Sequence, residues 1–332
     1  MKALQITAAG QTRILEVPQP QPGPGEVLLR MEYVGFCGTD LSTFRGKNAM
    51  VQFPRIPGHE IAASVVAAGP GVTALQPGDA VTVMPYTSCG ACASCRRGRP
   101  NACEHNQTLG VQRDGAMAEY LCVPQEKVIP CPGIGMREIA LIEPMCIGTH
   151  AVDRGRVEAR DTVMVIGCGM VGLGAVVAAV SRGATVIAAD MDDDKLALAR
   201  TLGASYTYNS SEPWAGLPDP DVVIEAVGAP ATYRLAIERV AFTGRVVCIG
   251  YAPADVPLPT GMFVKKELDI MGSRNATPED FVAVRDFIAG GAKVDPFISS
   301  VIAPDQAQSA LEAWSAAPGK VFRILVQWNT GN

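Results

Sequence analysis

The chain has 332 residues with a formal net charge of −5, and 48% of its residues are hydrophobic. Because this length exceeds what one compact core usually holds, we expect two domains. The acidic balance argues against a general nucleic-acid-binding protein, which usually carries a basic face. No signal peptide or membrane-spanning stretch is visible, so we expect a cytoplasmic protein whose cysteines are reduced thiols or metal ligands.

Residues 1–145 are rich in short strand-like runs that glycine and proline separate. The runs are EVLLRMEYVG, EIAASVVAAG, DAVTVMPY and AEYLCVP. Runs of this length, bounded by turn residues, predict a β-rich domain with irregular loops.

Several side chains in this region can bind a metal. Cys37 lies in GFCGTD, His59 and Glu60 lie in PGHE, and Glu143 follows in IEPM. Together a thiolate, an imidazole and a carboxylate leave one position of a zinc ion open, as catalytic zinc requires. Separately, the cysteine would be a core residue and the histidine a satisfied polar group. Spacing alone leaves both interpretations open.

Two neighbours of Cys37 could support such a centre. Asp40 could accept a hydrogen bond from the second ring nitrogen of His59 and so orient the imidazole. Thr39 could accept a proton from a hydroxyl bound to zinc. Both are therefore candidate catalytic residues.

A dense cysteine cluster comes next, with the spacing C-x2-C-x2-C-x7-C. Its members are Cys89, Cys92, Cys95 and Cys103. Four thiolates at these intervals can converge on one tetrahedral zinc ion and leave no open position, so the site would stabilise a loop. An iron–sulfur cluster also accepts four thiolates and is the alternative.

From Asp161 onward, strand-like runs alternate with helical patterns. The strand-like runs are TVMVIG, ATVIAAD, DVVIEAVG, RVVCIGY and LDIMGS. This alternation predicts a doubly wound α/β domain with a parallel sheet.

The first of these strands runs into the sequence GCGMVG, which fits the dinucleotide fingerprint GxGxxG. Gly167 allows a tight turn, Gly169 lets the backbone approach a pyrophosphate, and Gly172 lets the following helix pack close to the strand. We expect that helix to begin near Gly172, and its free N–H groups can bind phosphate. Met170 and Val171, within the fingerprint, are further candidate cofactor-binding residues. A glycine-rich turn without a ligand is the alternative.

The second strand ends at Asp190, at the position expected for a ribose-binding acid. Its carboxylate can accept bonds from both ribose hydroxyls and would repel a 2′-phosphate, which favours NAD over NADP. Its alternative roles are a helix N-cap or a solvated side chain.

Taken together, these motifs resemble the zinc-containing medium-chain dehydrogenases, the family of alcohol, polyol and threonine dehydrogenases. The resemblance covers nearly the whole chain, because GFCGTD, PGHE, the cysteine loop, DGAMAEY, EPMCIGTHAV, VIGCGMVG and KELDIMGS stand in the family's order. It implies a GroES-like β-rich catalytic domain over 1–148 and 276–332, and a Rossmann domain that binds NAD over 149–275. It also implies two zinc ions per chain, one catalytic and one structural.

The resemblance also implies roles for particular residues. Cys37 and His59 match catalytic zinc ligands, and Glu60 and Glu143 match the two acidic positions that can supply the third ligand. Which of the two does so stays open. Ser42 departs from the family, because many relatives have a histidine there that passes the substrate proton to solvent.

The implied reaction is hydride transfer between NAD and a secondary alcohol of a polyol or sugar acid. The motifs LGVQRDGAMAEY and GSRNATPEDF resemble bacterial sugar-acid dehydrogenases of the L-galactonate 5-dehydrogenase type. Arg274, Asn275 and Arg113 are candidate substrate contacts, since an arginine can bind a carboxylate with two hydrogen bonds. L-threonine 3-dehydrogenase and sorbitol-type activities are alternatives, and a non-enzymatic nucleotide binder is a different class. Relatives imply a homotetramer or homodimer.

Overall fold

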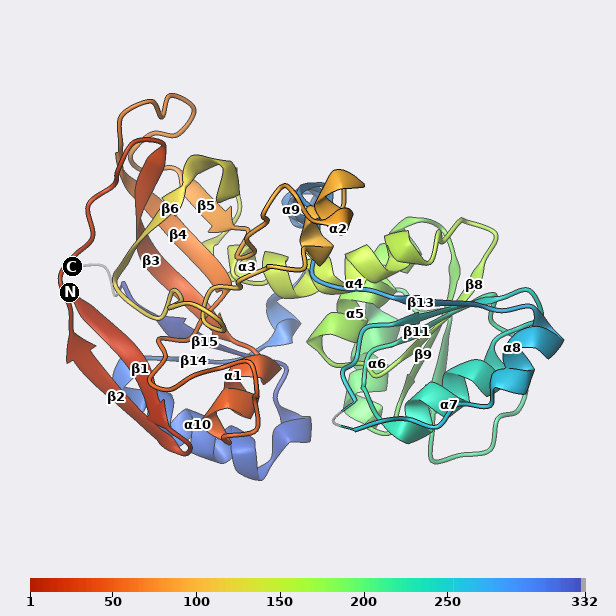
Figure 1. Cartoon of the computed structure of the whole chain (residues 1–332). Helices are drawn as coiled ribbons and strands as arrows, with labels where there is room; N and C mark the ends of the chain where they lie inside the picture. The colour runs from red at the N-terminus through yellow and green to blue at the C-terminus, as the bar shows by residue number, and fades with distance from the viewer. Residues whose placement is uncertain (253, 330–332) are drawn as a thin grey trace. The chain divides into compact units, whose positions relative to one another are not determined.

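The computed structural model describes residues 1–252 and 254–329. Two compact units divide the chain (Figure 1). The first unit comprises Met1–Glu143 and Thr277–Asn332, and the second comprises Pro144–Ala276. The second unit is therefore inserted between two segments of the first.

A seven-stranded sheet forms the framework of the first unit, counted over the described residues. Its order is β14-β15-β3-β4-β5-β7, and β6 also pairs with β3. The strands are β3 (Glu26–Phe36), β4 (Glu60–Ala68), β5 (Ala80–Val83), β6 (Tyr120–Pro124), β7 (Val128–Pro130), β14 (Ile298–Ile302) and β15 (Arg323–Gln327), and a separate hairpin comprises β1 (Lys2–Ala8) and β2 (Gln11–Glu16). Apolar residues of β3 and β4 pack with helix α10 (Ala307–Ala316) in one core, which includes Leu29, Phe36, Ile61 and Leu311.

Strand register brings distant parts of the chain to one end of this sheet. β3 lies between β15 and β4, antiparallel to both, with Phe36 opposite Ile324 and Gly35 opposite Glu60. Cys37 directly follows β3, and His59 directly precedes β4. The residues predicted to bind metal therefore lie where these strands begin or end.

The helices of the first unit are short, apart from two. They are α1 (Gly38–Phe44), α2 (Ala93–Arg96), α3 (Met136–Ile139), α9 (Pro278–Ala289) and α10 (Ala307–Ala316), with single 3-10 turns η1 (Pro100–Ala102), η2 (Gln125–Lys127), η3 (Asp295–Phe297), η4 (Pro304–Gln306) and η5 (Pro318–Lys320). Helix α4 (Ile142–Arg154) begins in the first unit and continues in the second.

The second unit contains a parallel sheet of six strands in the described part of the chain, in the order β10-β9-β8-β11-β12-β13. The strands are β8 (Thr162–Ile166), β9 (Thr185–Asp190), β10 (Tyr206–Asn209), β11 (Val222–Glu225), β12 (Arg245–Cys248) and β13 (Asp269–Gly272), and the helices are α5 (Met170–Ser181), α6 (Asp193–Thr201), α7 (Pro230–Arg239) and α8 (Thr260–Lys266). Strand order reverses between β8 and β11, as in a doubly wound fold. The central strands are buried on both faces, which explains their continuous apolar runs.

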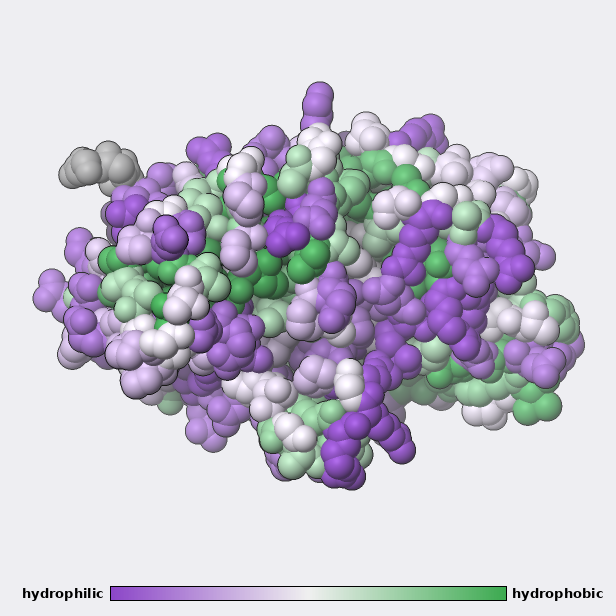
Figure 2. Space-filling model, turned by 90° about the horizontal axis from the view of Figure 1, so that it is seen from above, coloured by the Kyte–Doolittle hydropathy of each residue, from purple (hydrophilic) through white to green (hydrophobic). Residues whose placement is uncertain are grey.

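The surface in Figure 2 mixes hydrophilic and hydrophobic residues over one face of the molecule. None of the described helices has the length and apolar character needed to cross a membrane.

Candidate metal centres and dinucleotide site

Cys37, His59 and Glu60 converge in the first unit. One ligand atom from each lies within 4.8 Å of the other two. Cys37 occupies the N-cap position of α1, and His59 and Glu60 stand at the start of β4. The imidazole and the carboxylate are buried, and the thiol is half-buried. The fold thus assembles the predicted thiolate, imidazole and carboxylate at one point.

Buried polar atoms in this group lack hydrogen-bond partners, as expected for a site that binds a cation. Among the described residues, His59 Nδ1 has no hydrogen-bond partner and Glu60 Oε1 accepts no hydrogen bond, whereas Glu60 Oε2 lies 3.0 Å from Arg323 Nε in an ion pair. Buried polar atoms are normally satisfied, so such a cluster indicates a ligand. The donor types suit zinc, which binds thiolate, imidazole and carboxylate.

The pKa values in the cluster reflect burial and mutual interaction. Burial would raise the pKa of Cys37, but the hydrogen bond to His59 and its charge outweigh burial and lower it to about 7. Burial opposes protonation of His59, yet the hydrogen bond to Cys37 and its charge raise the pKa of the imidazole well above its usual value. Burial raises the pKa of Glu60, and the charge of Arg323 only partly offsets this. A divalent cation would favour the thiolate, the neutral imidazole and the carboxylate together.

Arg323 also belongs to this site, although no sequence motif predicts it. Its Nε lies 3.0 Å from Glu60 Oε2, and its Nη1 donates a hydrogen bond of 2.8 Å to the carbonyl oxygen of Phe36. The guanidinium is buried, and β15 positions it beside the end of β3. Nothing in the local sequence around Arg323 marks it, because only the strand register places it here.

Glu143 lies in the first turn of α4, close enough to His59 for their charges to interact. It is not part of the group formed by Cys37, His59 and Glu60. Instead, the hydroxyl of Tyr86 donates a hydrogen bond to Glu143 Oε1. Burial raises the pKa of Glu143, and the charge of His59 and the Tyr86 hydroxyl oppose that rise.

Asp40 and Thr39 both lie on α1. Asp40 Oδ2 accepts a hydrogen bond of 2.8 Å from the backbone N–H of Cys37, so this carboxylate fixes the N-terminus of α1. No hydrogen bond between Asp40 and the His59 ring is found among the described residues. Thr39 Oγ1 lies 3.8 Å from Cys37 Sγ.

The four-cysteine loop forms a second candidate centre. The sulfurs of Cys89, Cys92, Cys95 and Cys103 all lie within 4.8 Å of one another. Backbone N–H groups of Cys89 and Cys92 each donate to a cluster sulfur at 3.3 Å, which stabilises thiolates. The Ser94 hydroxyl, 3.1 Å from Cys92 Sγ, helps lower the pKa of that thiol to about 5. Four converging thiolates fit a saturated, structural metal site.

The glycine fingerprint links β8 to α5 in the second unit. Gly167 has a φ of +93°, which favours glycine, and Gly169 is the N-cap residue of α5. A Cβ atom on Gly172 would lie 1.7 Å from the carbonyl oxygen of Gly167, so only glycine fits there. Met170 and Val171 form the first turn of α5, so the helix begins two residues before the expected start at Gly172. The first N–H groups of this helix have no partner within the helix.

Asp190 is the last residue of β9, and its carboxylate accepts a hydrogen bond from the glycine-rich turn between β8 and α5. Its Oδ2 accepts a hydrogen bond of 2.7 Å from Cys168 N, and its Oδ1 accepts from the N–H groups of Met191 and Asp192. The N-cap of α6 is Asp192, so Asp190 does not cap that helix.

The predicted substrate residues lie in different units. Arg274 and Asn275 follow β13 in the second unit, and Asn275 has a φ of +54°. Arg113 lies in the first unit, in a turn that also contains Gly110 and Gly115. Both glycines pack against Gly58, immediately before His59.

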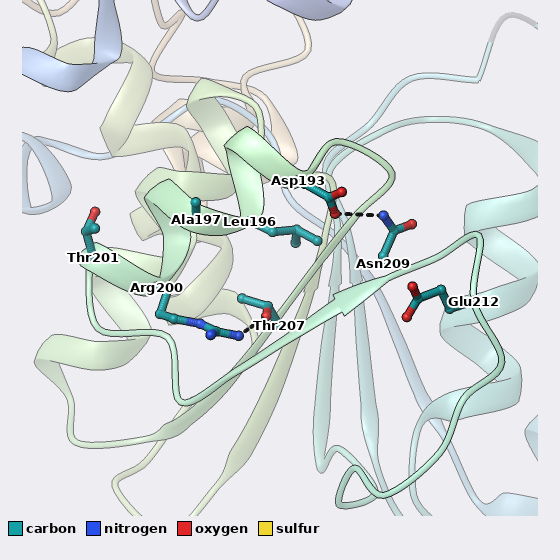
Figure 3. Close-up of a pocket in the computed structure, with 8 residues that line it drawn as sticks. All are labelled: Asp193, Leu196, Ala197, Arg200, Thr201, Thr207, Asn209 and Glu212. Carbon is teal, nitrogen blue, oxygen red and sulfur yellow. Dashed lines mark hydrogen bonds between the residues drawn. The ribbon is translucent and has the colours of Figure 1, made fainter.

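A pocket of about 560 Å³ lies between α6 and β10. Figure 3 shows Asp193 accepting a hydrogen bond from Asn209, and Arg200 donating one to Thr207. None of the predicted site residues is among its lining residues.

Comparison with known proteins agrees with this geometry. Residues 23–133 match the family model "Alcohol dehydrogenase GroES-like domain", and residues 170–290 match "Zinc-binding dehydrogenase". L-galactonate-5-dehydrogenase of Escherichia coli (strain K12) is 36% identical over 280 residues, which cover 82% of each chain. Sorbitol dehydrogenase of Bacillus subtilis (strain 168) is 31% identical, and the match covers 99% of this chain and 98% of that protein.

Solved structures show the same fold. A zinc-binding dehydrogenase from Sinorhizobium meliloti 1021 bound to NADP has a TM-score of 0.91 at 33% identity, covering 98% of both chains. The alcohol dehydrogenase rspB from E. coli CFT073, complexed with NADH, has a TM-score of 0.91 at 29% identity, covering 98% of this chain and 99% of that one.

The two units and their sites thus define a two-domain, zinc-binding oxidoreductase. The chain belongs to the zinc-type medium-chain alcohol dehydrogenase family. This membership confirms the predicted fold class, a GroES-like β-rich domain with a Rossmann doubly wound parallel sheet. It also confirms the predicted enzyme class, an NAD-dependent alcohol or polyol dehydrogenase, and the use of zinc and a nicotinamide dinucleotide.

Proposed function

We propose that the chain catalyses the reversible oxidation of a secondary alcohol group in a sugar acid or polyol, with NAD as the hydride acceptor. The observation that carries this proposal is the convergence of Cys37, His59 and Glu60 within 4.8 Å. These three side chains would hold the catalytic zinc, and the four-cysteine loop would hold a structural zinc. Zinc, when bound, acts as a Lewis acid that lowers the pKa of a substrate hydroxyl.

The residues around this centre have separate tasks. Arg323 holds the carboxylate of Glu60 through their ion pair, and Asp40 fixes Cys37 through its backbone N–H. The hydroxyl of Thr39 lies 3.8 Å from the Cys37 sulfur, which supports a role for Thr39 in taking the substrate proton. Ser42 has no pKa near neutrality, so Thr39 and water would pass the proton toward solvent.

The second unit would hold NAD at the carboxyl ends of its strands. The turn Gly167–Gly172 offers backbone N–H groups to the pyrophosphate. Asp190 would accept the ribose hydroxyls. Three further acids, Asp192–Asp194, follow it after Met191, and this concentration of negative charge would oppose the 2′-phosphate of NADP.

The names of the relatives support three candidate substrate classes. L-galactonate-5-dehydrogenase supports a sugar acid, and Arg274, Asn275 and Arg113 would then bind its carboxylate and hydroxyls. Sorbitol dehydrogenase supports a polyol as the second candidate. L-threonine 3-dehydrogenase is a third, since the enzyme of Pyrococcus horikoshii is 32% identical over 98% of this chain.

We further propose the domain division 1–148 with 276–332 and 149–275, a homotetramer or homodimer, and a cytoplasmic location.

A substrate panel tests this proposal. The purified enzyme is mixed with NAD and with sugar acids, polyols or L-threonine, and NADH absorbance is followed. We expect the highest kcat/KM with a sugar acid, and loss of turnover in Cys37→Ala and His59→Ala with the fold retained. Full activity in both variants, or no NADH with any substrate, would contradict the proposal and favour a non-enzymatic nucleotide binder.

A further inference from the structure

The metal centre of the first unit has two buried carboxylates with different partners. Glu60 lies within the group that contains Cys37 and His59, and it forms an ion pair with Arg323. Glu143 lies outside that group and accepts a hydrogen bond from a neutral hydroxyl, that of Tyr86. The two carboxylates are therefore not equivalent, although both lie near His59.

The phenol ring of Tyr86 is held in place from two sides. Tyr86 follows β5 and forms an isolated β-bridge with Thr108. Its ring packs edge-to-face on Phe281 of α9, with the ring centroids 6.5 Å apart and the planes at 71°. Phe281 is completely buried. A ring fixed by backbone pairing and aromatic packing directs its hydroxyl in a defined way.

Backbone structure also fixes Glu143. It stands in the first turn of α4, where the helix dipole favours a negative charge, and only 4% of the residue is exposed. Moving Glu143 Oε1 toward the thiolate and imidazole would break the bond from Tyr86 in a buried place, where a lost hydrogen bond is costly. The Tyr86 hydroxyl thus opposes direct binding of a metal by this oxygen.

This inference rests on the proposed function. We propose that Tyr86 is a positioning residue that acts through Glu143. It keeps Glu143 from joining the metal ligands, so that Glu60 supplies the carboxylate beside Cys37 and His59.

The test compares Tyr86→Phe with Tyr208→Phe, a matched control in the second unit. Tyr208 is also a buried tyrosine, and its hydroxyl donates a hydrogen bond of 2.9 Å to the carbonyl oxygen of Glu212. Each enzyme is prepared with zinc, and again with Co²⁺ exchanged into the centre at Cys37, whose visible absorption reports coordination number and geometry.

In Tyr86→Phe, Glu143 is free to join the metal ligands, so the Co²⁺ spectrum should change to that of a higher coordination number. A chelator should then remove the metal more slowly. We also expect kcat to fall about tenfold, with the KM for NAD unchanged. Tyr208→Phe should match the wild type in all three. In a Glu143→Gln background, Tyr86→Phe should have no further effect on kcat, because the two residues act as a unit.

Two results would overturn the inference. One is a Co²⁺ spectrum and kcat of Tyr86→Phe equal to those of Tyr208→Phe. The other is an effect on kcat that adds fully to that of Glu143→Gln. Both require an active wild-type enzyme, so they are distinct from failure of the proposed function, in which the wild type itself neither binds metal at Cys37 nor turns over.

Discussion

Arg323 and Glu60 form a buried ion pair, with 3.0 Å between Arg323 Nε and Glu60 Oε2 and side chains that are 4% and 0% exposed. The pair joins β15, near the end of the chain, to β4. Arg323 also holds the carbonyl oxygen of Phe36, the residue before Cys37. One guanidinium therefore connects both strand ends that carry predicted metal ligands.

Arg323→Gln should destabilise the first unit strongly. Removing one partner leaves the Glu60 carboxylate buried without its counter-charge, which typically costs about 3–5 kcal/mol. Urea unfolding of the zinc-loaded protein measures this. Arg160→Gln is the control, since Arg160 pairs with Glu158 at a surface where the side chains are 84% and 60% exposed. Equal unfolding midpoints for the two variants would show that the buried pair has no such role.

Gly169→Ala and Gly172→Ala should separate cofactor binding from folding. A Cβ on Gly169 meets no described atom within 4 Å, so stability should be unchanged, while the methyl group would obstruct the pyrophosphate and weaken NAD binding about tenfold or more. A Cβ on Gly172 would collide with the Gly167 carbonyl oxygen, so that variant should lose stability as well. NADH fluorescence titration and thermal unfolding measure the two effects. Unaltered NADH affinity in Gly169→Ala would refute a pyrophosphate at this turn.

Asp190→Ser should reduce the preference for NAD. The change removes the acceptor of the ribose hydroxyls, so the kcat/KM for NAD should fall at least tenfold. It also removes the repulsion of a 2′-phosphate, so the ratio of kcat/KM for NADP to kcat/KM for NAD should rise. It also removes the bond that Cys168 N donates, which loosens the glycine turn. Asp305→Asn, an exposed acid of the first unit, is the control. An NAD to NADP ratio equal to that of the control would contradict the role of Asp190.

Cys92→Ser should release the metal of the cysteine loop without abolishing catalysis. A structural zinc contributes to folding directly, so Tm should fall by several degrees, while kcat at low temperature stays within about twofold of the wild type. Cys122→Ser, a half-exposed thiol of β6 outside the cluster, should leave Tm nearly unchanged. Loss of all turnover in folded Cys92→Ser would place the chemistry in this loop instead.

Short sequence motifs predicted those parts of the sites that a single loop or a single strand–turn–helix unit forms. The cysteine spacing, the glycine fingerprint and the strand before Asp190 each occupy a short stretch, because one loop or one strand–turn–helix unit makes the whole feature. The alternation of strands and helices after residue 160 predicted the parallel sheet for the same reason. Resemblance to a family was needed to connect Cys37 with His59, since spacing alone left their convergence open.

Arg323 and Tyr86 could not be predicted in this way. Arg323 reaches Glu60 only because β15 and β4 both flank β3, and this register is a property of the whole sheet. Tyr86 donates a hydrogen bond to Glu143, which lies at the start of α4 and is 57 residues away in the sequence. Neither residue belongs to a short motif that carries its partner with it.

Zinc analysis tests the central claim most directly, namely that Cys37, His59 and a carboxylate bind a metal separate from the cysteine loop. The account predicts two zinc ions per wild-type chain, one per chain in folded Cys37→Ala, and one in folded Cys92→Ser. It would be contradicted if the wild type bound a single zinc that Cys37→Ala retained in full.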